Sequence, residues 1–166
     1  MNMGKPQLSK KNKVAMDASV LDRCIRFLLG TKDMEFDAIL KSGARFCRLR
    51  SNPKIPNDLE NYLPDCCGKL DAQAENRIKE RIEELKDFHD DPEDRGLLSE
   101  AEEVGIDVLL TRSSEFINNL GAKAKNVNIM TTSQYCERFP PNPSVRSPEP
   151  PKGTRPIDSK GTRKSS

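Results

Sequence analysis

Apolar residues recur along this chain at spacings that alternate between those of strands and those of helices. The first apolar stretch, Lys13–Met16, ends at Asp17 and predicts a short strand. Apolar residues then repeat three and four positions apart as far as Gly30, which predicts a helix with one buried face. These residues are Val20, Leu21, Cys24, Ile25, Leu28 and Leu29.

The next segments are shorter. Residues 36–40 predict a second helix. Residues 44–49, with the sequence ARFCRL, alternate apolar and basic side chains, which indicates a strand. Pro53 and Pro56 then break the chain before a short helix candidate at 57–63.

A long amphipathic helix is predicted between residues 70 and 88. Its apolar residues fall three or four positions apart, while Glu, Lys and Arg occupy the other positions. Such a stripe is far more typical of core packing than of a ligand site. The stripe consists of Leu70, Ala74, Ile78, Ile82, Leu85 and Phe88.

A further helix is predicted to begin at Asp91 and Pro92. Aspartate can accept hydrogen bonds from the free amides of the first turn, and proline suits the first helical position. This helix should end at Gly105. The remaining elements are a strand at 106–111, a helix at 113–120, a strand at 127–130 and a turn at 131–134.

Strands separated by helices imply crossover connections and therefore parallel strand pairs. The sequence thus predicts an α/β fold, a three-layer sandwich with a mainly parallel sheet of about four strands. The folded domain should span 13–138. Residues 1–12 are expected to be a flexible basic N-terminus, and 139–166 a disordered basic tail that holds seven of the twelve prolines.

The lengths of the apolar runs and the number of cysteines bear on where in the cell the protein is located. No apolar run approaches the length that crosses a bilayer, and no signal peptide is recognisable, so we expect no membrane association. The five cysteines form no CxxC pair. Their odd number, without a secretion signal, predicts reduced thiols and a cytoplasmic location.

The net charge of +2 hides an asymmetry. Residues 1–13 and 139–166 each carry +4, and residues 14–138 carry −6. A basic, flexible end can hold a polyanion through counterion release, while an acidic body can hold metal ions. The alternative is that the basic ends only keep the chain soluble.

Acidic and hydroxyl residues cluster in the predicted topology. Ligands bind beyond the carboxyl ends of strands in an open parallel sheet. Asp17 ends the first strand, Asp94 begins the helix before the third, and Ser113 and Glu115 follow that third strand, while Glu60 lies on the short helix after the second. Repulsion between converging carboxylates favours a bound Mg²⁺ or Mn²⁺.

Three segments resemble the PIN domain family. KVAMDASVL is similar to its opening, a strand that ends in Asp with a small hydroxyl residue, here Ser19, two positions later. DDPEDRGLLSEAEEVGIDVLLTRSSEF resembles its later signature, and NVNIMTTSQYCERF its closing strand and turn. The resemblance covers most of 13–138 and is weak between 30 and 90.

The resemblance implies a metal-dependent ribonuclease, with the VapC toxins of bacterial toxin–antitoxin pairs among its relatives. In that family clustered acids hold one or two ions that activate water. Asp17 matches the first acid and Asp94 the third, and both are expected metal ligands. Glu60 is our choice for the second, with Asp58 and Glu75 as rivals. The implied partners are single-stranded RNA, an antitoxin protein and a second copy of the chain.

The sequence departs from the family at the fourth position. Where PIN domains have Thr, any residue, then Asp, this chain has Thr111-Arg112-Ser113. A serine hydroxyl can hold a metal-bound water but brings no charge, and Glu115 can compensate from the next half-turn. The alternative is a catalytically degenerate domain that binds RNA or a protein partner.

Each candidate also has a plain structural explanation. Asp17 can end a strand in a turn, Asp94 can be an acid that the helix dipole favours, and Ser113 can be a helix cap. Glu60 fits a solvated surface position. His89, the single histidine, is expected at the surface near a helix end.

Overall fold

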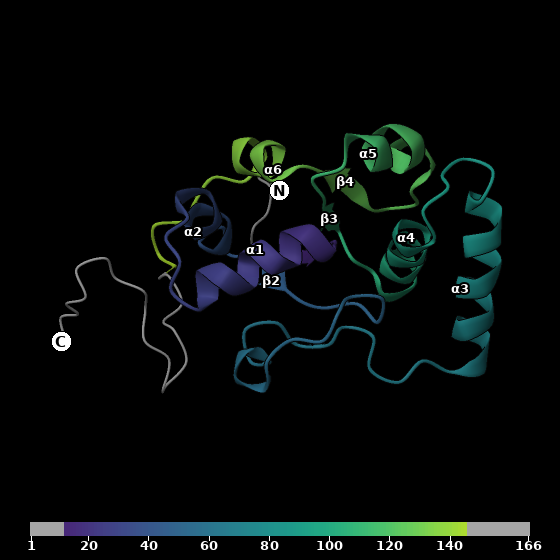
Figure 1. The fold of residues 1–166 in the computed structure, drawn as a ribbon, viewed down its shortest axis with the longest axis horizontal. Helices are drawn as coiled ribbons and strands as arrows, with labels where there is room; N and C mark the ends of the chain where they lie inside the picture. Colours follow the sequence, from purple (N-terminus) through teal and green to yellow (C-terminus); the bar gives the residue numbers. More distant parts are fainter. Residues whose placement is uncertain (1–11, 146–166) are drawn as a thin grey trace, which may run out of the picture.

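A four-stranded, all-parallel sheet with helices on both faces organises the chain (Figure 1). The structure, a computed structural model, describes residues 12–145. Its strands are β1 (Lys13–Met16), β2 (Arg45–Phe46), β3 (Val108–Leu110) and β4 (Asn128–Met130). Its α-helices are α1 (Ala18–Leu28), α2 (Met34–Leu40), α3 (Ala72–Leu85), α4 (Pro92–Val104), α5 (Ser114–Leu120) and α6 (Thr132–Arg138). Two short 3₁₀ turns are η1 (Asn57–Leu59) and η2 (Gly121–Lys123).

The strand order is β2-β1-β3-β4. The chain therefore places β2 on one side of β1 and β3 on the other, so the order reverses between β1 and β3. In register, Ala15 of β1 pairs with Leu109 of β3, and Leu109 pairs with Ile129 of β4. A reversal of this kind opens a crevice at the carboxyl ends of the two central strands, where ligands of open α/β sheets bind.

Alternate strand residues enter two separate hydrophobic clusters. Val14 and Met16 belong to a cluster that also contains the apolar residues of α1 and α2 and Tyr135 of α6. Ala15 and Leu109 belong to a second cluster with the apolar residues of α4 and α5. Because successive side chains of a strand point to opposite faces, the two clusters are the two interfaces of the predicted three-layer sandwich.

The predicted start and end of α4 are confirmed. Asp91 is the N-cap, and its carboxylate accepts a hydrogen bond from the Glu93 amide at 2.9 Å. Pro92 occupies the first turn. Gly105 ends the helix with a φ of 80°, a left-handed conformation that glycine adopts at low cost.

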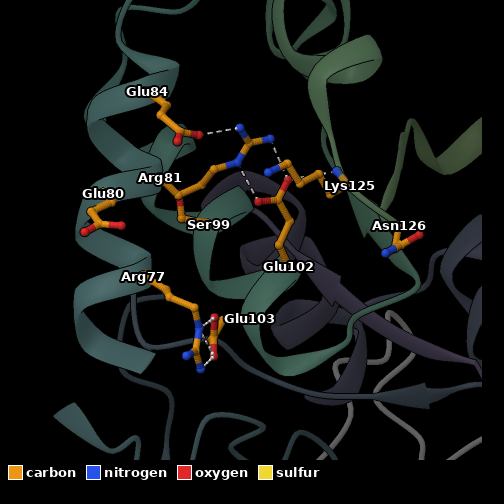
Figure 2. A pocket seen from close by; sticks show the side chains of 9 residues that line it. All are labelled: Arg77, Glu80, Arg81, Glu84, Ser99, Glu102, Glu103, Lys125 and Asn126. Carbon is orange, nitrogen blue, oxygen red and sulfur yellow. Dashed lines mark hydrogen bonds and ion pairs between the residues drawn. The ribbon is translucent and has the colours of Figure 1, made fainter. Parts of the chain in front are cut away.

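Helix α3 packs on the outer side of α4 (Figure 1). Arginines of α3 and glutamates of α4 pair across a cleft of about 360 Å³, which Figure 2 shows from close by. Arg81 Nε lies 2.7 Å from Glu102 Oε1, and Arg77 Nε lies 3.0 Å from Glu103 Oε1. We call these paired side chains the α3–α4 ion-pair cluster. None of the predicted site residues lines this cleft.

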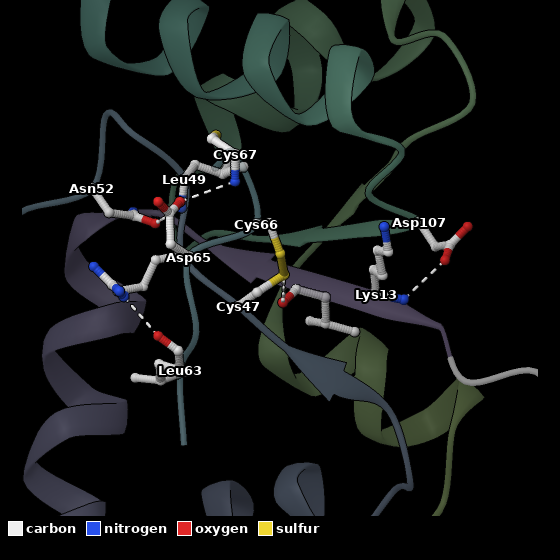
Figure 3. The surroundings of a disulfide bond; sticks show 11 residues. Lys13, Cys47, Leu49, Asn52, Leu63, Asp65, Cys66, Cys67 and Asp107 are labelled. Carbon is white, nitrogen blue, oxygen red and sulfur yellow. Dashed lines mark hydrogen bonds between the residues drawn. A yellow bond between two sulfur atoms is a disulfide. The ribbon is translucent and has the colours of Figure 1, made fainter. Parts of the chain in front are cut away.

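A disulfide joins Cys47 to Cys66, so the expectation of reduced thiols is wrong for this pair (Figure 3). Backbone hydrogen bonds hold the same two segments together. The Arg48 amide donates to the Pro64 carbonyl at 2.8 Å, and the Cys66 amide donates to the Arg48 carbonyl at 3.0 Å. The loop between them is therefore closed at its base. The thiols of Cys24, Cys67 and Cys136 are free.

Two predicted elements differ from the structure. The predicted turn at 131–134 is the first turn of α6, where Thr131 and Gln134 form a reciprocal capping box. The predicted helix at 57–63 is the single 3₁₀ turn η1. In α6 the capping box starts a helix where we expected a turn. In η1 the Leu59 amide bonds the Pro56 carbonyl, which gives a 3₁₀ turn in place of a helix.

Part of the predicted tail contacts the folded domain. Residues 139–145 belong to the predicted tail, yet Phe139 packs against Tyr135 and the Asn142 amide donates to the Lys41 carbonyl at 2.7 Å. The predictions for 1–11 and 146–166 fall outside the described residues. Within residues 12–145, no helix has the length and apolarity needed to cross a membrane.

Candidate functional site

Asp17 is held rigidly where β1 passes into α1. Its amide donates to the Leu110 carbonyl of β3 at 2.9 Å. Its Oδ1 caps α1 by accepting from the Val20 amide at 2.9 Å, and it also accepts from the Ser19 hydroxyl at 3.1 Å. Asp17 is thus both the N-cap of α1 and a buried carboxylate at the carboxyl end of the central strand.

Thr111 joins the ends of the two central strands. Its hydroxyl donates to Asp17 Oδ2 at 2.6 Å and accepts from the Ser113 amide at 3.0 Å. The threonine is fully buried. Because its single hydroxyl bonds both neighbours, the carboxylate of Asp17 and the start of α5 are fixed relative to each other.

Asp94 lies at the same edge of the sheet, in the first turn of α4. Burial raises the pKa of the Asp94 carboxyl, and the negative charges of Asp91 and Asp17 raise it further, while a hydrogen bond with His89 opposes the rise. The influence of Asp17 on this pKa means that the two carboxylates lie within electrostatic reach of each other. That both carboxylates act as ligands of one metal ion stays a prediction of the sequence.

His89 is hydrogen-bonded to Asp94, and the sequence analysis did not predict it as part of the site. Its Nε2 lies 2.7 Å from Asp94 Oδ2, and its Nδ1 lies 3.0 Å from Nδ2 of Asn119 on α5. The imidazole stacks on Phe116 and is buried, so the expected surface position is wrong. A signal existed: His89 follows Leu85 by four residues and continues its buried stripe, whereas Phe88, which we assigned to that stripe, is 46% exposed.

Asn52 is a second residue that the sequence analysis missed. Its side-chain amide donates to the Met16 carbonyl at 2.8 Å, and its Oδ1 accepts from the Leu49 amide at 2.8 Å. The disulfide-closed loop therefore reaches the carboxyl end of β1 through this residue. A lone asparagine directly before Pro53 carries no sequence signal for such a contact.

Ser19 bonds Asp17 directly, whereas the remaining predicted site residues form no hydrogen bond with Asp17 or Asp94 within residues 12–145. Ser113 is the N-cap of α5 and accepts from the Phe116 amide at 3.1 Å, which confirms its plain explanation. Glu60 and Glu115 are exposed, and so is Asp58. Glu75 pairs with Arg50 at 2.7 Å. Among residues 12–145, no three His, Cys, Asp or Glu side chains form a group that could hold a metal ion.

The pair nevertheless offers oxygen ligands to a hard cation. Asp17 Oδ2 accepts a single hydrogen bond, from Thr111. Asp94 Oδ1 accepts none from the part of the chain that the structure describes, since His89 bonds Oδ2. Mg²⁺ in proteins keeps several waters and is often bound by one or two carboxylates. Asp17 and Asp94 fit an ion of this kind, whose remaining ligands are water and substrate oxygen.

Comparison of this chain with protein-family models, with curated proteins and with solved structures finds no match. The functional argument therefore rests on the geometry of the site and on the residues of the chain itself.

Proposed function

We propose that this protein is a PIN-like, metal-dependent endoribonuclease that acts on single-stranded RNA with Mg²⁺ or Mn²⁺ between Asp17 and Asp94. One observation carries the proposal. Two carboxylates from distant parts of the chain share the edge of a parallel sheet at the point where its strand order reverses. Their order in the sequence also matches the PIN resemblance.

The residues of the chain would act mainly by placing oxygen atoms. A bound divalent ion activates water and stabilises charge at a phosphodiester. Thr111 fixes Asp17 Oδ2, and the α1 amides and Ser19 fix Oδ1, so the carboxylate needs no rearrangement to meet an ion. The Ser113 hydroxyl, next to Thr111, is our candidate to hold a metal-bound water. Glu60 and Glu115 remain candidates for the missing acids only if RNA or metal draws them in.

A second candidate function has its own support. Because no group of three or more possible metal ligands is found in the described residues, the domain can be a degenerate PIN-like module that binds RNA or a protein partner without cleavage. An antitoxin partner, a homodimer and a cytoplasmic location stay predictions of the sequence. The cytoplasmic location was predicted partly from reduced thiols. The Cys47–Cys66 disulfide weakens that argument, because cytoplasmic thiols are normally kept reduced.

Cleavage assays with the purified full chain test the proposal. We expect a panel of single-stranded RNAs to be cut in Mg²⁺ or Mn²⁺, and Asp17→Asn to reduce the rate about 10³-fold or more, because a metal-ligating charge is lost. Asp107→Asn is the matched control. Asp107 accepts from the Lys13 amide at the opposite edge of the sheet, so its loss should leave cleavage unchanged.

RNA that stays intact with both metals would contradict the nuclease. Binding that persists without metal would then support the second candidate. Shortening the chain to residues 1–145 should weaken such binding and flatten its salt dependence if the basic tail contacts RNA.

A further inference from the structure

The single histidine of the chain occupies a specialised position. His89 lies in the connection between α3 and α4, buried against the ring of Phe116 with ring centroids 5.6 Å apart. Arg95 of α4 donates to the backbone carbonyl of His89 at 2.9 Å. The ring is therefore held by stacking on one side and by its own backbone on the other.

The partners of the ring select one tautomer. The Nδ2 of Asn119 only donates hydrogen bonds, so His89 Nδ1 must accept. The ring hydrogen then sits on Nε2 and is donated to Asp94 Oδ2 at 2.7 Å. The imidazole thus donates to a carboxylate, and its orientation is set by an amide on a different helix.

The donor to Asp94 differs from the donors in the α3–α4 ion-pair cluster, where arginines meet the acids. A single ring N–H fixes the Asp94 carboxylate through its Oδ2. Oδ1 is then the oxygen left for a ligand.

We propose that His89 is a positioning residue that holds Asp94 ready for the divalent ion, with Asn119 holding the tautomer of His89. This inference rests on the proposed function, because it concerns the same ion. Groups that hydrogen-bond metal ligands in this way typically change metal affinity 10- to 100-fold when they are lost.

Two substitutions separate the hydrogen bond from the shape of the ring. His89→Phe keeps an aromatic ring on Phe116 but removes the donor. His89→Gln places an amide donor near the position of Nε2. We expect Mn²⁺ affinity of the full chain, measured by calorimetry and by the electron paramagnetic resonance of free Mn²⁺, to fall about 10- to 100-fold in His89→Phe and to recover in His89→Gln.

Tyr135→Phe is the matched control. It also removes a buried hydrogen bond, between the hydroxyls of Tyr135 and Ser42 at 2.7 Å, but in the cluster on the other face of the sheet. It should lower the unfolding midpoint without changing Mn²⁺ affinity. Should His89→Phe fail to fold, Asn119→Leu keeps His89 in place and frees its tautomer, and it should weaken Mn²⁺ binding by the same mechanism.

The possible outcomes are distinct. If the wild type binds Mn²⁺ and His89→Phe binds it equally well, the role of His89 is overturned while the proposed function stands. A glutamine variant as weak as the phenylalanine variant would assign the effect to packing and would also overturn it. A wild type that binds no Mn²⁺ overturns both proposals. Finally, ¹⁵N spectra of the ring should show the hydrogen on Nε2, and a hydrogen on Nδ1 would contradict the inference.

Discussion

Two acidic regions of this molecule differ in the groups that hydrogen-bond their carboxylates. In the α3–α4 ion-pair cluster, each of Glu102 and Glu103 meets an arginine through two hydrogen-bonded atoms. At the carboxyl edge of the sheet, Asp17 and Asp94 meet hydroxyl groups, backbone amides and an imidazole ring.

The pKa shifts follow this contrast. A hydrogen bond from Arg77 lowers the pKa of Glu103. Burial raises the pKa of Asp94, and the charges of Asp91 and Asp17 add to the rise. The acids of the first region are paired with arginines, whereas within residues 12–145 no lysine or arginine forms an ion pair with Asp17 or Asp94. The contrast teaches that the number of acids in a region matters less than whether arginines accompany them.

The largest expected effect is stabilisation of the sheet-edge pair by an added cation. Mn²⁺ at about 1,000 times its Kd should raise the free energy of unfolding by about 4 kcal/mol. Asp94→Asn should remove most of this gain, and Glu102→Gln should keep it. Thermal unfolding with and without Mn²⁺ measures both. If Mn²⁺ raised the free energy of unfolding equally in the two variants, the proposed difference between the two acidic regions would be wrong.

A smaller effect is expected from breaking the ion-pair cluster itself. Arg81 and Glu102 are largely buried, with side-chain exposures of 14% and 10%. Glu102→Gln removes the buried charged partner of Arg81 and leaves only the exposed Glu84 to pair with it, so it should lower stability by about 1–3 kcal/mol. Urea unfolding measures this change.

Glu84→Gln is the control for that experiment. Glu84 bonds the same arginine, but its side chain is 60% exposed, so its loss should cost about 0.5 kcal/mol or less. Similar losses in the two variants would show that burial does not distinguish these pairs. RNA cleavage should be unchanged in both.

The smallest effect is a pH dependence of opposite sign in the two regions. The pKa of Glu103 lies below its ordinary 4.5, so its contribution to stability is present above pH 4.5 and is lost as the pH falls through the lowered value. The pKa of Asp94 lies above 3.8, so the stability of the wild type relative to Asp94→Asn is greatest below pH 3.8 and falls as the pH rises through the raised value.

Urea unfolding of the wild type, Glu103→Gln and Asp94→Asn across the acid range without metal measures both trends. Because Glu103 is paired near the solvent, its contribution should stay below about 1 kcal/mol. Two difference curves with the same slope would contradict the contrast between the regions.

Much of the fold was predictable because its signals are local. The capping residues of α4 and the apolar spacing of α1 lie within a few positions of the structure they produce. The capping box of α6 was equally local and was overlooked. Asp17 and Asp94 could be named from their places at a strand end and a helix start.

The rest of the site was beyond such signals. Asn52 has no pattern around it, and the disulfide between Cys47 and Cys66 depends on two segments that run side by side only in the folded chain. Glu60 and Glu115 were chosen by position along the sequence. Both side chains are exposed, and their place in the site stays a prediction.

By itself, the sequence determined the parallel α/β architecture, since apolar periodicity and capping residues act over one or two helical turns. Only the tertiary structure decided which side chains share the sheet edge. The Thr111 hydroxyl meets Asp17 across 94 positions, and Asn119 meets His89 across 30. Contacts of that span depend on how the crossover helices seat against the sheet, which no local pattern encodes.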